Sequence, residues 1–419
     1  IWFNLNRTIR SNVCNRMSTI EVNKITPVSG GTAIQVGESG DTITIPSGCT
    51  ITNSGTANNF GDSLRPNAEP IIINGDMKVA QRGTSFTGVS SGSNWPVDRF
   101  EFYPANLGAY TIIQEALTSG EAYNNGFRTA LRIDTTTADA SPAASDYSIL
   151  RTKFEGQDLQ SFKKGTSNAE KFTLAFWVKS NKTTTGQVNL FDIDNDRLVS
   201  GTYTISSANT WEKKIINFPA DTTGAFDDNT ALSLIVEFFL DSGSNFSSGT
   251  APTAWEAQTN ADRNANNFAI GSSTDNDFAI TGVQLEVGEF TSATIPPFQH
   301  EKFGNNIVRC KRYYQQIDRP SYGDNTVLVG ITTNGNQMFM VRLPVSMRSA
   351  PTISMTGTVI TVYSTNSSAN VSASNPTLSA GTFGTDGGRL LYAKIGDNGH
   401  GSWVDIDNNN THMSFDAEI

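Results

Sequence analysis

The most constraining feature of the sequence is a strictly alternating stretch, KFTLAFWVKS at residues 171–180. Its even-numbered positions from Phe172 to Val178 are all apolar, whereas the odd-numbered positions are mostly polar or small. Alternation with a period of two places successive side chains on opposite faces of a β-strand. We therefore predict a strand with one face in a hydrophobic core and with Trp177 on the other face.

Short strands with related patterning recur through the middle of the chain. Five further segments have this character: 146–154, 186–193, 211–219, 231–240 and 278–288. Turns rich in Gly, Asn and Asp separate them, and Asn334-Gly335 predicts a tight hairpin further along. A content of 36 Gly and only 37% hydrophobic residues suits many short strands. The predicted fold class is all-β, with a central antiparallel jelly-roll sandwich.

Changes in composition divide the chain into three predicted parts. Residues 1–67 form an N-terminal arm and a β attachment or oligomerisation segment, because the alternating Ile and Thr residues of GDTITIPSGCTIT cannot bury a face alone. Residues 68–300 form the jelly roll, and residues 301–419 form a short connecting helix and a C-terminal β-sandwich-like tip. The residues before Met17 are an arm, a non-Met start or a processing remnant.

Hydropathy argues against a membrane role. The most hydrophobic run, residues 234–240, is too short to span a bilayer and contains Glu237. The start of the chain lacks the long apolar core of a signal peptide. We expect a soluble protein without membrane insertion and without a secretion signal.

Charge and the scarcity of reactive residues exclude several classes of function. The chain has 40 acidic and 30 basic side chains, so its net field repels nucleic acid. Cys14, Cys49 and Cys310 lack metal-binding spacing, and only three histidines are present. We therefore predict no nucleic-acid partner, no catalytic site and no cofactor.

Two acidic segments have oxygen ligands at intervals related to those of a calcium loop. In DIDNDR at residues 192–197, Arg197 stands where such a loop needs Gly. The segment at residues 405–416 fits better because Asp416 is its twelfth residue, but Asn410 replaces the Gly. We interpret the first segment as a polar β-turn and predict no metal site at either.

The segment RCKRYYQQI at residues 309–317 fits a nucleic-acid patch, a reactive thiol or a buried helix. Apolar residues recur at helical spacing at positions 303, 307, 310, 314 and 317. Asn305 or Asn306 can cap the first turn. Because Cys310 falls on the apolar stripe and no His is nearby in sequence, we favour a buried structural cysteine, with the cations on a solvated or interfacial face.

Several long segments carry a family resemblance. IIINGDMKVAQRGTSF, KFEGQDLQSFKKGTSNAEKFTLAFWVKS and ITGVQLEVGEFTSATIPPFQHEKFGNN, with MSTIEVNKITPVSGG near the start and FDAEI at the end, resemble tail-fibre and tail-appendage proteins of tailed bacteriophages, especially marine and cyanophage ones. The resemblance covers nearly everything from Met17 onward. It implies a carbohydrate-binding-like jelly roll, a homotrimer, attachment to the virion through the N-terminal segment, and a location on the virion after synthesis in the host cytoplasm.

An exposed Trp beside carboxylates or amides is typical of a glycan contact, since the ring covers the C–H face of a sugar while polar groups bond its hydroxyls. Trp403, Asp405 and Asp407 share one phase of their segment, and Asn409 follows. Trp177 is the second candidate. At both places the alternatives are packing between subunits or a second core face. The tryptophans predicted to lie in the core are Trp95, Trp211 and Trp255.

Three functions remain distinct at this stage. The favoured one is a tail fibre or receptor-binding protein that adheres non-covalently to a host-surface glycan or lipopolysaccharide. The alternative is a non-binding structural appendage, such as a head fibre, a capsid decoration or a baseplate-associated protein. A polysaccharide depolymerase is disfavoured, because no carboxylate pair stands out and the repeated strands of a β-helix are missing.

Overall fold

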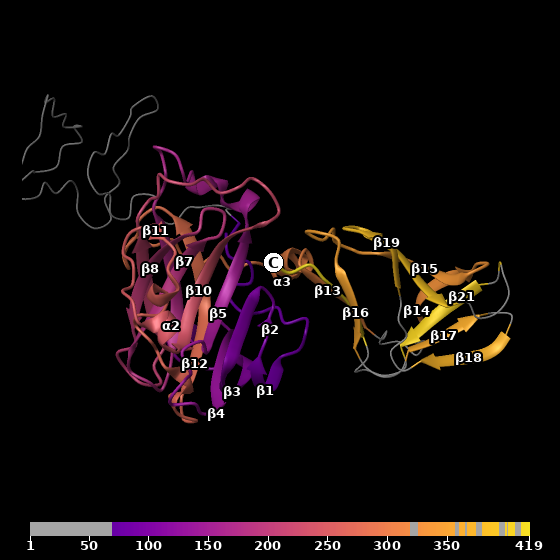
Figure 1. Cartoon of the computed structure of the whole chain (residues 1–419), viewed down its shortest axis with the longest axis horizontal. Helices are drawn as coiled ribbons and strands as arrows, with labels where there is room; N and C mark the ends of the chain where they lie inside the picture. Colours follow the sequence, from indigo (N-terminus) through magenta and orange to yellow (C-terminus); the bar gives the residue numbers. More distant parts are fainter. Residues whose placement is uncertain are drawn as a thin grey trace, which may run out of the picture. The chain divides into compact units, whose positions relative to one another are not determined.

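A computed structural model describes residues 69–318, 326–356, 360–364, 367–373, 379–393, 399, 401–406 and 412–419 (Figure 1). The chain divides into two compact units, residues 1–58 and 59–419, and every described residue belongs to the second. The predicted attachment segment, with Cys14 and Cys49, lies outside the described residues. The described part is mainly β, as predicted.

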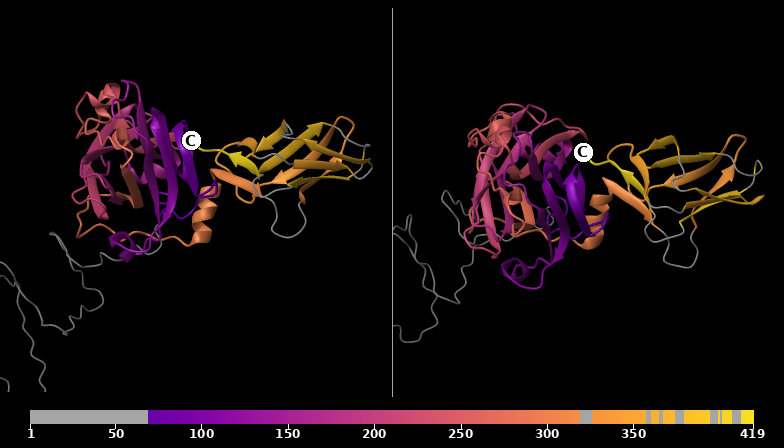
Figure 2. Two further views of the ribbon diagram at one scale, coloured as in Figure 1. Left: turned by 90° about the horizontal axis from the view of Figure 1, so that it is seen from below. Right: turned by 60° about the horizontal axis from the view of Figure 1, so that its bottom comes forward.

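In the described part, twelve strands form one antiparallel sheet that curls on itself (Figures 1 and 2). Their hydrogen-bonded order is β11-β8-β7-β10-β5-β3-β4-β12-β6-β9, and β1 and β2 pair with β3. The strands are β1 (Ser85–Ser91), β2 (Asn94–Val97), β3 (Phe100–Ala116), β4 (Thr129–Thr137), β5 (Tyr147–Glu155), β6 (Phe172–Lys179), β7 (Thr185–Asp192), β8 (Arg197–Thr204), β9 (Glu212–Phe218), β10 (Leu232–Ser242), β11 (Glu256–Ala257) and β12 (Asp277–Val287).

The long strand β3 joins the two layers of this sheet. Its first half pairs with β5, and its second half pairs with β4. Strands β8 and β9, which lie near opposite ends of the strand order, also approach each other. The sheet therefore closes into the predicted jelly-roll sandwich.

The core of the sandwich is built as the alternation predicts. Phe172, Leu174, Phe176 and Val178 of β6 are completely buried in one continuous hydrophobic cluster. Burying side chains of this size contributes about 1.5–3 kcal/mol each. The other five predicted strand segments correspond to β5, β7, β9, β10 and β12. Trp95, Trp211 and Trp255 are buried as predicted, Trp255 in this cluster and the other two outside it.

A buried ion cluster fixes the loops at one end of the sandwich. The fully buried ammonium of Lys164 lies 2.5 Å from Asp192 and 3.0 Å from Asp221. It also donates to the carbonyl oxygens of Thr223 and Gly224 at 3.1 and 2.8 Å. Asp192 ends β7, and residues 193–196 form the polar turn predicted for DIDNDR. The negative charge of the Asp192 carboxylate is thus compensated by the Lys164 ammonium.

Helices are short throughout the described residues. They are α1 (Glu121–Asn124), α2 (Ser244–Ser247), α3 (Phe303–Lys311) and the 3₁₀ turns η1 (Gly156–Phe162), η2 (Asn260–Asp262) and η3 (Ile270–Ser272). None of these described helices has the length and apolar character needed to cross a bilayer.

The connecting helix differs from its prediction at both ends. It begins after Lys302 without a side-chain cap, and Asn306 is buried inside it. It ends at Lys311, and Tyr314–Asp318 form strand β13, because this segment pairs with the C-terminal strand β22 (His412–Asp416). Tertiary strand pairing thus overrides the helical spacing.

The side chains of α3 follow the prediction only in part. Phe303 is 57% exposed, so the expected apolar stripe does not begin there. Cys310 is buried, as predicted, and burial raises the pKa of its thiol well above the usual value. The cations are interfacial: Arg309 donates to the Pro70 carbonyl at 2.7 Å, and Arg312 binds both oxygens of Glu155.

The C-terminal part forms two packed sheets. One has the order β13-β22-β16, and the other has the order β18-β17-β21-β14-β15-β20-β19. Their remaining strands are β14 (Thr326–Thr332), β15 (Asn336–Arg342), β16 (Thr352–Thr356), β17 (Ile360–Ser364), β18 (Ser367–Ala373), β19 (Ser379–Gly384), β20 (Gly387–Ala393) and β21 (Gly401–Ile406). Met413 and Phe415 of one sheet share a core with Phe339 and Leu390 of the other, which gives the predicted sandwich-like tip. The Asn334-Gly335 hairpin is confirmed between β14 and β15.

Candidate functional site

Trp177 faces away from the main core, as predicted, on the outer surface of β6. In register it lies between Lys213 of β9 and Thr281 of β12. A second hydrophobic cluster covers part of this surface, and it consists of Leu117, Ala122, Phe127, Ala130, Trp211 and Ala279, with Tyr123, Trp177 and Phe298 at its edge. The alternative of a second core face therefore holds for part of the indole, which is half-buried.

A β-bulge shapes the surface beside this indole. The register between β12 and β6 shifts between Thr281 and Gln284, and Gly282 has a φ of 62°. A Cβ atom on Gly282 would lie 2.5 Å from Phe127 Cζ and 3.0 Å from Trp177 Cδ1. Only glycine combines this backbone conformation with this close approach. The bulge lets the aromatic rings meet over the sheet.

The resulting surface pocket has a volume of about 220 Å³. Its lining consists of Asn125, Phe127, Trp177, Lys213, Gly282, Gln284, Pro297, Phe298 and His300. We call it the Trp177 pocket. Typical small-molecule sites enclose roughly 300–1,000 Å³, so this one suits a single ring or the end of a chain.

Packed rings form one wall of the Trp177 pocket. Phe127 meets Phe298 edge to face with 5.0 Å between ring centroids, and His300 lies 5.0 Å from Phe127 and 4.9 Å from Phe298. Partial burial, with Lys78 nearby, lowers the pKa of His300. The imidazole is therefore mainly neutral at pH 7.

The polar lining of the pocket includes two donors, the Trp177 indole N–H and the Lys213 ammonium, beside the amides of Asn125 and Gln284. Within the described residues, the indole N–H of Trp177 has no hydrogen-bond acceptor and the Lys213 ammonium has no ion-pair partner. Gln284 uses its amide to donate to the Pro296 carbonyl at 3.0 Å. None of the described lining residues is Asp or Glu, so the site has no carboxylate pair for hydrolysis. Its chemistry fits non-covalent binding against an aromatic surface.

The other predicted candidates lie on the C-terminal seven-stranded sheet. Trp403 and Asp405 are half-buried residues on the same side of β21, and each already has an interaction partner in the chain. Trp403 pairs with Val329 of β14, which is 72% exposed. Asp407 and Asn409 lie outside the described residues. The predicted candidates are therefore split between two sheets, with Trp177 apart from Trp403.

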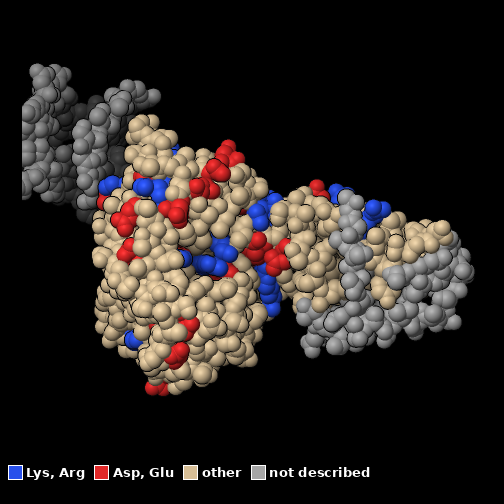
Figure 3. All heavy atoms as spheres, viewed as in Figure 1, with Lys and Arg blue, Asp and Glu red and all other residues tan. Residues whose placement is uncertain are grey.

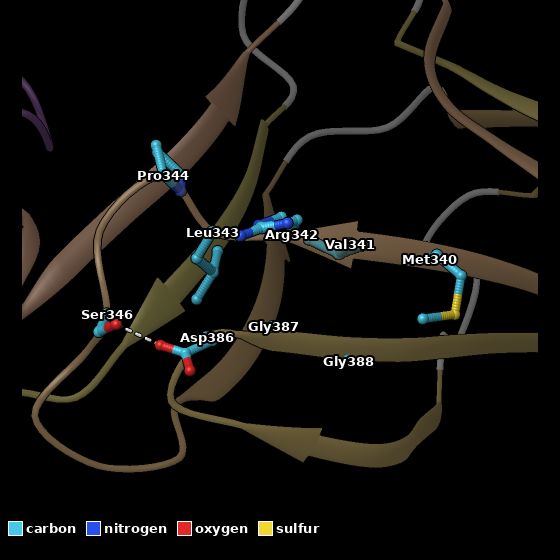
Figure 4. A pocket seen from close by; sticks show the side chains of 9 residues that line it. All are labelled: Met340, Val341, Arg342, Leu343, Pro344, Ser346, Asp386, Gly387 and Gly388. Atoms are coloured by element: carbon cyan, nitrogen blue, oxygen red, sulfur yellow. Dashed lines mark hydrogen bonds between the residues drawn. The ribbon is translucent and has the colours of Figure 1, made fainter.

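A larger open hollow of about 730 Å³ lies at the end of β15 and the start of β20 (Figure 4). Its lining is mostly aliphatic residues and glycine, with Met340 and Arg342 on β15, Leu343 directly after it, and Gly387 and Gly388 on β20. Its acid is already bonded, because the Ser346 hydroxyl donates to the Asp386 carboxylate. No aromatic ring is found among the described residues that line the hollow, so it is a weaker candidate for a sugar site.

Sequence reasoning identified Trp177 but missed its partners. Phe127 follows helix α1, and Phe298 and His300 follow β12, so all three come from loops far from β6 in the sequence. His300 is one of only three histidines, which was the one available signal. Lys213 could have been found from the alternation of β9, whose odd positions share the outer face with Trp177.

No protein-family model and no curated protein sequence matches the chain. Among solved structures, it is similar to the enzymatically active domain of tailspike protein 4 of bacteriophage CBA120, with 12% identity, a TM-score of 0.26, and coverage of 52% of this chain and 21% of that one. It is also similar to the CBM22-1 xylan-binding domain of Paenibacillus barcinonensis Xyn10C, with 6% identity, a TM-score of 0.24, and coverage of 53% of this chain and 97% of that one. A third similar structure is the family 11 carbohydrate-binding module of Lic26A-Cel5E of Clostridium thermocellum, with 10% identity, a TM-score of 0.24, and coverage of 48% of this chain and 99% of that one. Values this low carry no conclusion about this chain.

Proposed function

We propose that the protein is an external virion component of a tailed bacteriophage, a tail fibre or receptor-binding protein, that adheres non-covalently to a host-surface glycan through its jelly roll. The family resemblance of the sequence supports the virion role, a homotrimer, and attachment through the N-terminal segment. Several copies of a weak site on one particle raise the overall avidity.

The observation that carries the glycan proposal is the Trp177 pocket. It combines a half-buried indole, packed aromatic rings and N–H donors that lack an acceptor within the described part of the chain, all on the surface of the sheet. Aromatic rings with a few polar groups are the usual means of holding a sugar ring. The absence of Asp and Glu from the described lining favours adhesion over cleavage.

An array of bacterial surface polysaccharides, probed with the purified protein, tests the proposal. Trp177→Ala should weaken binding at least about tenfold, which corresponds to about 1.4 kcal/mol, whereas Trp177→Phe keeps a ring and should lose less. Trp403→Ala is the control at the second candidate. Equal binding by wild type and folded Trp177→Ala would refute this site, and release of reducing ends from a bound polysaccharide would refute non-catalytic adhesion.

One observation favours the structural appendage as the second candidate function. Val329, Ile331 and Met340 on β14 and β15 are 72%, 41% and 63% exposed. Adjacent exposed apolar side chains are typical of surfaces that pack against protein. A folded protein that binds no polysaccharide would support this alternative.

A further inference from the structure

Two cations near the Trp177 pocket are not balanced by carboxylates of the described residues. Lys213 lies directly across from Trp177 in the β6–β9 register, without an ion pair among the described residues. Arg128, which acts electrostatically on His300, stacks on Tyr123 at 4.0 Å and donates only to backbone carbonyls. These two cations have no carboxylate partner in the described part of the chain.

The other charges near the pocket neutralise one another. Lys78 pairs with Asp76 at 2.7 Å, and Lys179 lies 3.7 Å from Glu115. Ion pairs of this kind recur in the jelly roll, and blue and red side chains are intermixed over it in Figure 3. The unpaired cations near the Trp177 pocket contrast with the net charge of −10 of the whole chain. The described lining has no carboxylate, so the hydroxyls of a neutral sugar would find only the amide oxygens of Asn125 and Gln284 and the His300 ring as side-chain acceptors.

We propose that the Trp177 pocket selects an anionic sugar, whose ring stacks on the indole while its carboxylate or phosphate is held by the Lys213 ammonium. This inference rests on the proposed glycan-binding function and names the ligand class. The donors of the site, the ammonium and the indole N–H, match the acceptor oxygens of such a group. Arg128, which acts electrostatically on His300, adds longer-range attraction.

Calorimetric titration with three probes tests the inference. The probes are trigalacturonic acid, the same trisaccharide with its carboxyl groups reduced to hydroxymethyl groups, and mannose 6-phosphate. Lys213→Gln removes the charge but keeps a polar side chain of similar reach. Lys171→Gln is the matched control, because Lys171 lies on the same face of the β6 segment, roughly 20 Å away at about 3.3 Å per residue, and is paired with Glu289.

We expect an acidic probe to bind at least tenfold more tightly than the reduced trisaccharide. Lys213→Gln should abolish most of that preference, with a loss of about tenfold, and Lys171→Gln should leave it unchanged. The preference should shrink at high salt, because the ammonium is exposed. The acidic probe whose affinity depends on Lys213 identifies the source of the charge as carboxylate or phosphate.

The outcomes separate the two proposals. The wild-type protein could instead bind the acidic and reduced trisaccharides with equal affinity, with this binding lost in Trp177→Ala and unchanged in Lys213→Gln. That result would overturn the proposal of an anionic ligand and leave the proposal of glycan binding intact. Acidic binding that folded Trp177→Ala retains would place the attraction elsewhere and also overturn the inference. Binding of no probe and of no polysaccharide on the array would overturn both. Circular dichroism of each variant confirms that it is folded.

Discussion

Substitution of Gly282 by alanine tests whether the bulge holds the aromatic cover against the sheet. The added Cβ would lie 2.5 Å from Phe127 Cζ, well inside van der Waals contact. Gly88 of β1 provides a matched control: its φ of 66° is close to the 62° of Gly282, but a Cβ there meets nothing within 4 Å. Both substitutions force a left-handed conformation on alanine, and only one creates a clash.

The two costs can be separated by this comparison. Left-handed backbone costs a non-glycine residue about 1–2 kcal/mol, and overpacking typically adds about 1–3 kcal/mol. Gly88→Ala should therefore lower the free energy of unfolding by about 1–2 kcal/mol, and Gly282→Ala by about 2–5 kcal/mol. The excess measures how firmly Phe127 is held over the bulge.

Urea denaturation followed by tryptophan fluorescence gives both values on one scale. Gly282→Ala should also weaken glycan binding, because the displaced ring narrows the Trp177 pocket, whereas Gly88→Ala should not affect it. Equal destabilisation of the two variants would refute the reasoning. It would mean that the loops carrying Phe127 move aside without cost, and that the pocket is not preorganised.

Two further predictions concern charge. Lys164→Met should destabilise the jelly roll by about 3–5 kcal/mol, because it leaves the buried Asp192 without its counter-ion. The control Lys163→Met breaks an exposed ion pair with Glu170 and should cost at most about 1 kcal/mol in the same denaturation assay. Binding of an acidic sugar should strengthen as the pH falls below 7 towards the lowered pKa of His300, because the bound anion favours the imidazolium. Among the neighbouring charges, Lys78 and Arg128 oppose protonation of His300, and Asp76 favours it. Titration of His300→Gln between pH 7 and 5 should lack the effect, and an unchanged pH profile in that variant would contradict it.

The strands could be predicted wherever one face meets the core and the other meets solvent. β6 is the clearest example, since its alternation gives both its limits and the outward direction of Trp177. β3 lacks that signal, because Pro104 and Gly108 interrupt its pattern and because its first half pairs with β5 in one layer and its second half pairs with β4 in the other. Breaker residues mark turns in most sequences, and only the surrounding pairings make them acceptable inside a strand.

The connecting helix shows the opposite failure. Residues 314 and 317 fit the helical spacing as well as they fit a strand, because aromatic and β-branched residues are compatible with either. The choice is made by the C-terminal strand β22, which pairs with Tyr314–Asp318 although most of the tip's sequence lies between the two strands. A pairing partner so remote in sequence leaves no local trace, so spacing alone could not predict where α3 ends.

The two candidate tryptophans lie in surroundings that suit different partners. Trp177 has the Lys213 ammonium beside it, and the second cluster already holds part of its ring, so ligand binding costs little entropy in ordering the indole. Trp403 has Val329 beside it, and Val329 in turn lies next to Met340 by the register of β14 and β15, with both side chains mostly exposed. Sugar hydroxyls over such an apolar row would lose water without gaining partners. Of these two surfaces, the Trp177 pocket therefore suits a polar ligand, and the Trp403 face suits contact with protein.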